Sequence, residues 1–493
     1  MSRDITIGID IGTSGCKSVA VRQGRVLASA TEGYPLYTPR PGYSEQNPVD
    51  WWSGVCRSVS QVCKQINADE IAAVSLSGQM HGMVALDREY QVIRPAILWN
   101  DQRTQKQCDE ITAAAGGLDA LLEHTNNMML TGYTGGKILW LRENEKENFD
   151  KTYKIINPKD YILLRLTGEL CTDMSDASGT GLFNVKTRTW ATDLIRKLDL
   201  DPDLFVTPLE SVDAAGNITA EASEATGIPE GTVVYAGGGD AVISTVAMGL
   251  TPGKVGVTLG TSGVVAVTLP GFAPNPRGLL QVFCGNLKGS WVAFGCTLSA
   301  AGSYQWLRDK LFGEYSFEDL NGMAEKVPAG SDGLLFTPYL TGERCPLFDP
   351  KATGGFFGLT VNMGRGHFAR AVMEGVVFSL RQVYELICKS ANIAPEGILA
   401  GGGGTKGALW RQILADIFGL PVSLSPGAAE GGAYGAALLA GIGHGLYDSK
   451  TAAGFCGAEE VIPPVPENAK VYESAYAKYV RLYDSVKWLN MGE

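Results

Sequence analysis

Two glycine-rich segments, about half the chain apart, have the residue types of a loop that holds phosphate. Gly8-Ile-Asp-Ile-Gly-Thr-Ser-Gly15 returns as Gly256-Val-Thr-Leu-Gly-Thr-Ser-Gly263, and β-type residues flank each copy. Glycine lets backbone N–H groups point into a concavity, and the Thr and Ser hydroxyls add donors. The expected phosphate-binding residues are Gly12, Thr13, Ser14 and Lys17 in the first copy and Gly260, Thr261 and Ser262 in the second.

One position distinguishes the two copies. Asp10 ends the strand before the first loop, and Thr258 takes its place in the second copy. A carboxylate at this position can hold Mg²⁺, directly or through water. We therefore expect the first loop to serve a metal and the second mainly to bind phosphate. A tight hairpin without a ligand would explain one such loop, but two matched copies argue against that alternative.

A second carboxylate with candidate chemistry is Asp240, which follows three glycines and the apolar strand Val233–Tyr235. An aspartate at such a strand end, facing a cleft, can accept the proton of a substrate hydroxyl during phosphoryl transfer. The same residue type also caps helices, and we expect a helix to begin near Ala241. From the residues alone both interpretations are open.

Two further segments carry side chains that suit a polyhydroxylated ligand. Gln79 and His81 follow a predicted strand, and His81 is one of four histidines. Trp99-Asn-Asp-Gln-Arg103 adds an aromatic ring, the carboxylate of Asp101 and a guanidinium group. The alternatives stay open: a histidine at a strand end is often structural, and the second segment is also typical of a capped helix start.

A third glycine loop, Gly401-Gly-Gly-Gly-Thr-Lys-Gly407, follows a predicted strand and precedes a predicted helix. Its spacing matches a dinucleotide fingerprint, which also expects an acid at the end of the next strand. Here that strand, 422–425, ends in Ser, and the loop lies far into the second half. We interpret Gly401, Gly402, Gly403 and Gly404 as a surface for an adenosine rather than a nicotinamide site. No GxxxxGK[ST] motif occurs in the chain.

These loops need a framework of strands and helices around them. The first copy predicts strand, glycine loop, strand, a turn at Gln23-Gly24 and another strand. Apolar spacing predicts helices over 374–390, 409–418 and 433–439, and a helical stripe of aromatic residues near the C-terminus. With 493 residues the chain should form two domains, 1–248 and 249–493, joined at Thr251-Pro-Gly253.

Composition excludes several classes of protein. A formal net charge of −11 argues against nucleic-acid binding, which needs a basic surface. The ten cysteines contain no CxxC pair, as expected for reduced thiols in the cytoplasm. No uncharged apolar run approaches the roughly 20 residues of a membrane helix, and the N-terminus is polar. We expect no nucleic-acid or membrane partner. A homodimer is left open, since no self-complementary surface is readable.

These loops, in this order, resemble the FGGY carbohydrate kinases over essentially the whole chain. Gly132-Tyr-Thr-Gly-Gly-Lys137-Ile-Leu-Trp140-Leu-Arg-Glu-Asn144 fits the first motif of that family. Gly354-Gly-Phe-Phe-Gly-Leu359, with His367-Phe-Ala-Arg-Ala-Val-Met-Glu374 after a spacer, fits the second. Within the family, the segments 43–48, 78–82, 158–161 and 173–180 are similar to the branch that phosphorylates D-xylulose.

The resemblance implies a fold and a set of roles. The fold is α/β, with two ribonuclease-H-like domains of the actin-like ATPase superfold and a cleft between them. Asp240 is then the catalytic base, Asp10 belongs to the magnesium–phosphate centre, and Met80 and His81 bind the sugar. ATP is held by Thr13, Thr261 and the loop from Gly401 to Gly404, and the expected cofactors are ATP and Mg²⁺.

The chain departs from that branch at two positions. Ala241 stands where the branch usually has an Asn that touches the sugar, and Gly404 stands where it usually has Ala. The first departure leaves another ketose, a sugar alcohol or a sugar acid open as substrate. A non-catalytic nucleotide-binding module and a nicotinamide dehydrogenase are the remaining alternatives. Asp10, His81 and Asp240, each within its motif, argue against the module, and only the glycine spacing at Gly402 favours the dehydrogenase.

Overall fold

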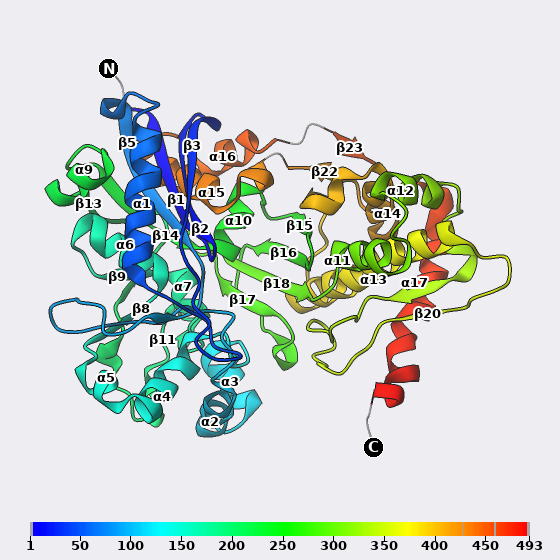
Figure 1. The fold of residues 1–493 in the computed structure, drawn as a ribbon, viewed down its shortest axis with the longest axis horizontal. Coiled ribbons are helices and arrows are strands. Elements are labelled where there is room, and N and C mark those ends of the chain that lie inside the picture. The colour runs from blue at the N-terminus through cyan, green and yellow to red at the C-terminus, as the bar shows by residue number, and fades with distance from the viewer. Residues whose placement is uncertain (1–2, 426, 458–459, 491–493) are drawn as a thin grey trace.

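The computed structural model describes residues 3–425, 427–457 and 460–490, which form two sheets side by side (Figure 1). The first sheet has the order β13 (Ala214–Asn217), β14 (Val233–Gly239), β5 (Ile71–Gly78), β1 (Ile5–Ile11), β2 (Gly15–Arg22), β3 (Arg25–Gly33). The second has the order β17 (Gln281–Cys284), β18 (Trp291–Thr297), β16 (Gly263–Leu269), β15 (Lys254–Leu259), β21 (Gly397–Gly401), β22 (Val422–Leu424), β23 (Val461–Ile462).

The two sheets share one topology. β1 pairs antiparallel with β2 and parallel with β5, just as β15 pairs antiparallel with β16 and parallel with β21. The next parallel neighbours are β14 and β22, and the outer antiparallel ones are β3 and β18. The repeated sequence thus forms an equivalent hairpin in each half. This confirms the predicted pair of ribonuclease-H-like domains.

The predicted turn after the first hairpin is present. β2 pairs with β3 through Arg22 and Arg25, and the two residues between them, Gln23 and Gly24, have φ of 48° and 78°. Positive φ at both positions is the geometry of a two-residue hairpin turn.

Helices cover both sheets. In the first half α1 (Pro48–Cys63) packs on β2 and β3, and α6 (Pro158–Thr167) packs beside β14. In the second half the predicted helices are present as α13 (Arg365–Ala391), α14 (Ala408–Phe418), α15 (Gly427–Gly443) and α17 (Pro466–Val486). The aromatic stripe of α17 is a packing face, as predicted, because Tyr472 and Tyr479 are fully buried.

The remaining elements form the outer parts of each half. Those of the first half are β4 (Glu45–Gln46), β6 (Val84–Leu86), β7 (Ala96–Ile97), α2 (Gln105–Ala115), α3 (Leu118–Thr125), α4 (Thr134–Asn144), α5 (Lys146–Lys151), β8 (Lys154–Ile156), β9 (Cys171–Asp173), α7 (Met174–Ser178), β10 (Phe183–Asn184), β11 (Thr189–Trp190), α8 (Thr192–Lys197), β12 (Thr207–Leu209) and α9 (Ala220–Thr226). Those of the second are α11 (Ala301–Trp306), α12 (Phe317–Glu325), β19 (Leu335–Thr337), β20 (Gly355–Phe357) and α16 (Ser449–Phe455).

One helix of the second half returns to the first sheet. α15 packs against β1 and β5 and against α10 (Asp240–Ala247), beside the blue strands in Figure 1. The approach is so close that a Cβ on Gly8 would lie 1.8 Å from the carbonyl oxygen of Ala433. A Cβ on Gly435 would lie 2.6 Å from the carbonyl oxygen of Ile243. Glycine at these positions therefore lets two helices and a strand meet between the halves.

β17 and β18 also contact the first half. Phe283, Val292 and Phe294 share a buried cluster with Met80, Tyr133 and other residues of the first half. This cluster forms the floor between the halves and places side chains of both on the same cavity. No helix in the described part of the chain is both long and apolar enough to cross a membrane.

Candidate active site

Residues from both halves enclose a cavity of about 430 Å³. The first half contributes Met80, His81, Trp99, Asp240 and Ala241. The second half closes the opposite wall. The remaining lining residues are Gln102, Leu130, Thr131, Gly132, Tyr133, Gln281, Phe294, Cys296, Arg344 and Phe348. This set mixes aromatic walls with a few polar groups, which is the usual lining of a small-molecule site.

His81 lies at the end of β5 in an unusual backbone conformation, with φ of 67°. Its Nδ1 lies 2.7 Å from the carbonyl oxygen of Gly179, and its ring stacks on Tyr133 at 4.7 Å. Burial lowers the pKa of His81 to about 3, so the ring is neutral. Because a carbonyl oxygen can only accept, Nδ1 carries the proton and Nε2 is left as an acceptor. A sugar hydroxyl is the kind of donor that this nitrogen suits.

Two groups hold the main chain of His81 in place. Lys137 Nζ donates to the carbonyl oxygens of His81 and Gly132 at 2.5 and 2.6 Å, and Thr134 donates to the first at 3.1 Å. Lys137 is fully buried at the start of α4. It belongs to the motif that carried the family resemblance, and its contacts now give that motif a structural reason.

Asp240 is the first residue of α10, directly after β14, and it lies on the same cavity as His81. Gly239, not Asp240, occupies the N-cap position, although the Asp240 carboxylate accepts a bond of 2.7 Å from the N–H of Ala241. Burial raises the pKa of Asp240 to about 7, and the nearby charge of Asp10 acts in the same direction. A carboxylate with this pKa can both take up and release a proton near neutral pH.

Asp10 lies at the end of β1, and its Oδ1 is buried without a hydrogen-bond partner among the described residues. Burial raises the pKa of Asp10. The kinked start of α15 approaches it so closely that a Cβ on Gly432 would lie 2.7 Å from Oδ1. An orphaned, buried carboxylate oxygen beside a glycine loop fits the need of a cation.

The donor set at Asp10 fits Mg²⁺ more closely than a metal bound by protein ligands alone. Within residues 3–425, 427–457 and 460–490, no group of three or more His, Cys, Asp or Glu side chains could hold a metal. Mg²⁺ commonly takes only one or two carboxylates, with water and substrate phosphates as its other ligands. Asp10 alone is therefore a sufficient protein ligand for such an ion.

A larger cavity of about 540 Å³ lies in the second half, over the second and third glycine loops. Gly260 and Thr261 line one side, and Gly403 and Gly404 line another. The other lining residues are Leu259, Ala301, Gly302, Tyr304, Gln305, Phe317, Asn321, Lys406, Gly407 and Trp410. Tyr304 and Phe317 stack at 5.8 Å, which gives the cavity an aromatic wall. Apolar walls beside two glycine loops suit a purine nucleotide.

A third cavity, of about 310 Å³, adjoins the first and extends toward the larger one. It shares Ala241, Phe294 and Cys296 with the first cavity and reaches Thr258, Gly402 and Gly431. Gly402 is required at this junction, because its φ is 92° and a Cβ there would lie 2.6 Å from the carbonyl oxygen of Leu259. Cavities lined by neighbouring residues therefore extend from His81 and Asp240, along the second hairpin, to the nucleotide-sized cavity.

The structure does not bring every predicted residue to a cavity. Gln79 is 1% exposed, and its amide donates to Gln46 at 2.9 Å, behind the first glycine loop. Gly401 is buried in β21. Lys17 points to α15, where Nζ lies 2.9 Å from a carboxylate oxygen of Glu430. Thr13 accepts a bond of 2.9 Å from the indole N–H of Trp99, so it ties the first loop to the wall of the first cavity.

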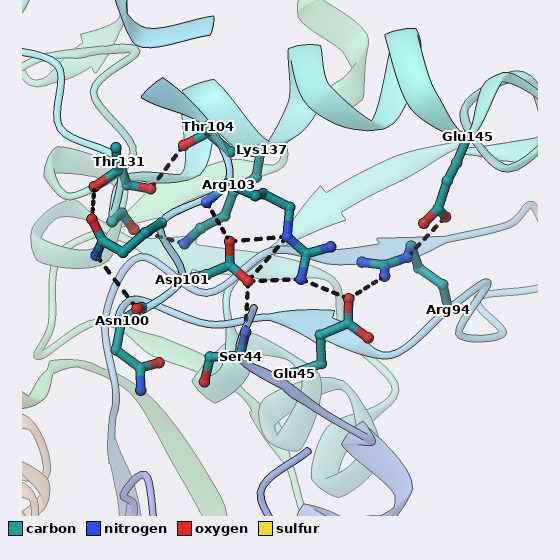
Figure 2. A network of polar contacts seen from close by, with 12 residues as sticks. Ser44, Glu45, Arg94, Asn100, Asp101, Arg103, Thr104, Thr131, Lys137 and Glu145 are labelled. Atoms are coloured by element: carbon teal, nitrogen blue, oxygen red, sulfur yellow. Dashed lines mark hydrogen bonds and ion pairs between the residues drawn. The ribbon is translucent and has the colours of Figure 1, made fainter. Parts of the chain in front are cut away.

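Asp101 also lies behind the cavity, in the buried network of Figure 2. Its carboxylate accepts from the N–H of Ser44 at 2.7 Å and from the guanidinium of Arg103 at 2.7 to 3.0 Å. Arg103 in turn pairs with Glu45 and lies 3.7 Å over the ring of Tyr43. Asp101 is thus part of the support for the segment that carries Trp99, and it neither lines the cavity nor caps a helix, since α2 begins at Gln105.

Sequence reasoning missed the contribution of the second half to the first cavity. Gln281 and Phe294 lie on β17 and β18, and Arg344 lies in a loop held by the buried carboxylate of Glu343, which accepts from the N–H groups of Leu298 and Arg344. The segment Gly342-Glu-Arg-Cys-Pro346 combines charged residues with Gly and Pro, which is a weak signal of a functional loop.

Comparison with known proteins identifies the family. The FGGY family of carbohydrate kinases, N-terminal domain, matches residues 5–247, and its C-terminal domain matches residues 255–444. A xylulose kinase of Bacillus subtilis (strain 168) is 38% identical over 490 residues, covering 98% of this chain and 97% of that protein. A gluconokinase of the same organism is 30% identical, covering 97% of this chain and 95% of that protein. The crystal structure of xylulose kinase from Rhodospirillum rubrum has a TM-score of 0.92 at 30% identity and covers 99% of each chain.

These matches extend over both halves and over every loop described above. The resemblance found in the sequence is therefore confirmed, and so is its α/β fold. The chain belongs to the FGGY family of carbohydrate kinases and is a sugar phosphotransferase with the actin-like ATPase fold.

Proposed function

We propose that the chain transfers the γ-phosphoryl group of ATP to O5 of D-xylulose, with Asp240 as the general base. The observation that carries this proposal is a series of neighbouring cavities, with Asp240 and His81 on the first and two glycine loops on the last. The substrate is taken from similar chains, several of which are xylulose kinases at 34 to 38% identity.

The first cavity would bind the sugar. The unprotonated Nε2 of His81 would accept a hydrogen bond from a sugar hydroxyl, while the rings of Trp99 and Phe294 would cover the carbon skeleton. A cavity of about 430 Å³ holds a five-carbon sugar with room to spare. Gln79 and Asp101 would not touch the sugar. They would hold the first glycine loop and the Trp99 segment in place.

Asp240 would accept the proton of the sugar hydroxyl. With a pKa of about 7, its carboxylate is ionised in much of the protein at neutral pH and can take the proton of the attacking hydroxyl. Most of the remaining catalytic effect would come from positioning and from charge stabilisation, as is usual for phosphoryl transfer. Closure of the two halves around the cavity would exclude water that otherwise hydrolyses ATP.

The phosphates would lie between the two hairpins. Backbone N–H groups of residues 13, 14, 261 and 262 and the hydroxyls of Ser14, Thr261 and Ser262 would hold their oxygens, and the adenosine would lie in the cavity of about 540 Å³. Asp10 would hold Mg²⁺, which when bound supplies positive charge opposite the transferred group. The first half, residues 1–248, would thus carry the sugar, the base and the metal, and the second half the nucleotide.

A second candidate is phosphorylation of a sugar acid such as gluconate. The exposed Arg344 lines the first cavity and offers the group that pairs best with a carboxylate. Ala241, also on that cavity, leaves space beside Asp240 for a longer chain. A gluconokinase is among the similar proteins. Another ketose or a sugar alcohol is tested by the same experiment.

The test is ADP release from ATP and Mg²⁺ with each of eight substrates: D-xylulose, D-ribulose, L-ribulose, L-xylulose, D-fructose, erythritol, glycerol and gluconate. We expect the highest kcat/KM with D-xylulose. Preference for gluconate, lost in Arg344→Ala, would replace D-xylulose by a sugar acid. If no substrate stimulates ADP release, the proposed function is wrong.

A further inference from the structure

Behind the strand end that carries Asp240, a lysine and three aspartates are completely buried. Lys159 Nζ lies 2.8 Å from Asp160, 3.3 Å from Asp173 and 3.7 Å from Asp176, and all four side chains are 0% exposed. Lys159 also donates to the carbonyl oxygen of Ala236 at 3.1 Å. Burying charges in this way stabilises a fold little or not at all compared with apolar packing. The cluster therefore calls for an explanation other than stability.

The cluster is connected to the residue that precedes Asp240. Asp173 Oδ2 accepts from the N–H and the hydroxyl of Ser175, at 2.7 and 2.6 Å. The same Ser175 oxygen accepts a bond of 2.9 Å from the N–H of Gly239. Gly239 is the N-cap of α10, so this chain of bonds ends one residue before the carboxylate of Asp240.

The strand at this point needs such support, because its own pairing is interrupted. The register between β14 and β5 shifts between Tyr235 and Gly238. Gly237, within the shift, has φ of 70°, and a Cβ there would lie 2.0 Å from the carbonyl oxygen of Leu76. A bulge of this kind redirects the residues that follow it. Lys159 holds the start of the bulge at Ala236, and Ser175 holds its end at Gly239.

The bulge leaves no space for a side chain at Gly238. A Cβ on Gly238 would lie 2.4 Å from the amide nitrogen of Asn286 and 2.9 Å from the hydroxyl of Ser175. The Asn286 amide, which comes from the second half, donates to Ser211 at 3.0 Å, and Ser211 lies 3.5 Å from Asp173. The bulge is therefore closely surrounded, by Ser175 and Asn286 at Gly238 and by Leu76 at Gly237.

We propose that Lys159, Asp173 and Ser175 form a positioning relay that fixes the bulge of β14 and thereby aims the Asp240 carboxylate at the substrate hydroxyl. The relay rests on the proposed function, because it acts through the base of that reaction. None of its members touches the substrate cavity, so they are positioning residues. Asp176, the third aspartate of the buried cluster, is not a member of the relay. Neither of its carboxylate oxygens has a hydrogen-bond partner in the part of the chain described, and burial raises its pKa well above the ordinary value.

The test compares two serines on the same short helix, α7. Ser175→Ala removes the acceptor of the Gly239 N–H. Ser178→Ala is the matched control, since Ser178 is 1% exposed and its hydroxyl accepts from the N–H of Cys284 at 3.1 Å. Each variant loses two buried hydrogen bonds, one accepted from a backbone N–H and one donated, to Asp173 by Ser175 and to the carbonyl oxygen of Met174 by Ser178 at 2.7 Å. We therefore expect Tm to fall in both, and somewhat more in Ser175→Ala because its bond to the carboxylate is charge-assisted. Only Ser175→Ala should lower kcat, by roughly 10- to 100-fold, because a misplaced catalytic group has this effect, while its KM for ATP stays unchanged.

Each result has one meaning. Equal kcat in the two variants would overturn the relay. The proposed function would still stand in that case if the wild type phosphorylates one of the substrates. A wild type that phosphorylates none of the eight substrates overturns both. Should Ser175→Ala fail to fold, Ser175→Cys keeps the side chain's size but weakens both of its bonds. A lowered kcat with normal KM for ATP in that variant supports the relay, and a wild-type kcat contradicts it.

Discussion

The two glycine hairpins have the same strand order but differ by one residue in their register and differ in their surroundings. Gly12 donates to the carbonyl oxygen of Gly15 at 3.0 Å, and Gly260 to that of Ser262 at 3.1 Å. In the first hairpin, Thr13 is bonded to Trp99 and Gln79, and its carbonyl oxygen accepts from Gln46.

In the second hairpin, Thr261 and Ser262 are exposed, and Thr261 lines the nucleotide-sized cavity. The fold thus supplies two related glycine loops, and the side chains around them differ. The first loop is joined to the wall of the first cavity and follows the buried carboxylate of Asp10, whereas the second opens onto the nucleotide-sized cavity.

The largest expected effect comes from making the first loop resemble the second. Asp10→Thr should lower kcat by roughly 10²- to 10³-fold, since a buried charge at the transferred group is lost. Thr258→Ala, at the equivalent position, should change kcat less than about tenfold, the scale of one lost neutral hydrogen bond. Steady-state kinetics at saturating Mg²⁺ measure both. Similar losses in the two variants would mean that the hairpins are chemically equivalent.

A pH profile distinguishes the first cavity from the nucleotide-sized cavity. The pKa of Asp240 is raised to about 7, so the carboxylate is protonated, and inactive as a base, below that pH. We expect kcat/KM for the sugar to fall about tenfold per unit below pH 7 and to level off above it. Between pH 5 and 7 the KM for ATP should change much less, because the residues around the second loop carry no carboxylate of this kind. A flat profile for the sugar would remove Asp240 from the rate.

The junction of the second and third loops should tolerate no side chain. In Gly402→Ala the new Cβ meets the carbonyl oxygen of Leu259 in a backbone conformation that L-residues disfavour. We expect a loss of about 1 to 3 kcal/mol, seen as a lower Tm and a higher KM for ATP. Gly403→Ala is the control for Tm, since a Cβ there meets no protein atom within 4 Å. Unchanged Tm in Gly402→Ala would contradict the close contact.

The smallest expected effect tests the link between Thr13 and the sugar cavity. Trp99→Phe keeps an aromatic ring at this position and removes the indole N–H that bonds to Thr13. One hydrogen bond of about 0.5 to 1.5 kcal/mol predicts a 2- to 10-fold lower kcat/KM for the sugar. Ser262→Ala in the second loop should instead raise the KM for ATP and leave that of the sugar unchanged. An effect of Trp99→Phe on ATP alone would reverse this assignment.

Local patterns predicted the hairpins because the determinants are local. The repeat of glycine and β-type residues is enough to indicate β1–loop–β2 and β15–loop–β16, and the apolar spacing is enough for α14 and α17. The destination of α15 could not be predicted, because the contact of Ala433 with Gly8 joins residues at opposite ends of the sequence.

The site was predicted in part for a similar reason. Asp240, His81, Met80 and Trp99 lie on one cavity, as their motifs implied. Asp101 and Gln79 have side chains equally suited to a sugar, but they are buried behind the wall, and residue type alone does not distinguish a polar group that binds a ligand from one that supports a loop. Arg344 and Phe294 were missed because β17, β18 and the loop of Arg344 reach the cavity only through the packing of the two halves.

The measurement that tests the central claim most directly is ADP release by Asp240→Ala with D-xylulose, ATP and Mg²⁺ at saturation, together with ATP binding by calorimetry. If Asp240 takes the proton of the sugar hydroxyl, turnover falls by about 10²- to 10⁴-fold while the affinity for ATP is unchanged. Near-normal turnover by this variant would contradict the account, because the cavity that joins Asp240 to His81 would then not be where the phosphoryl group is received.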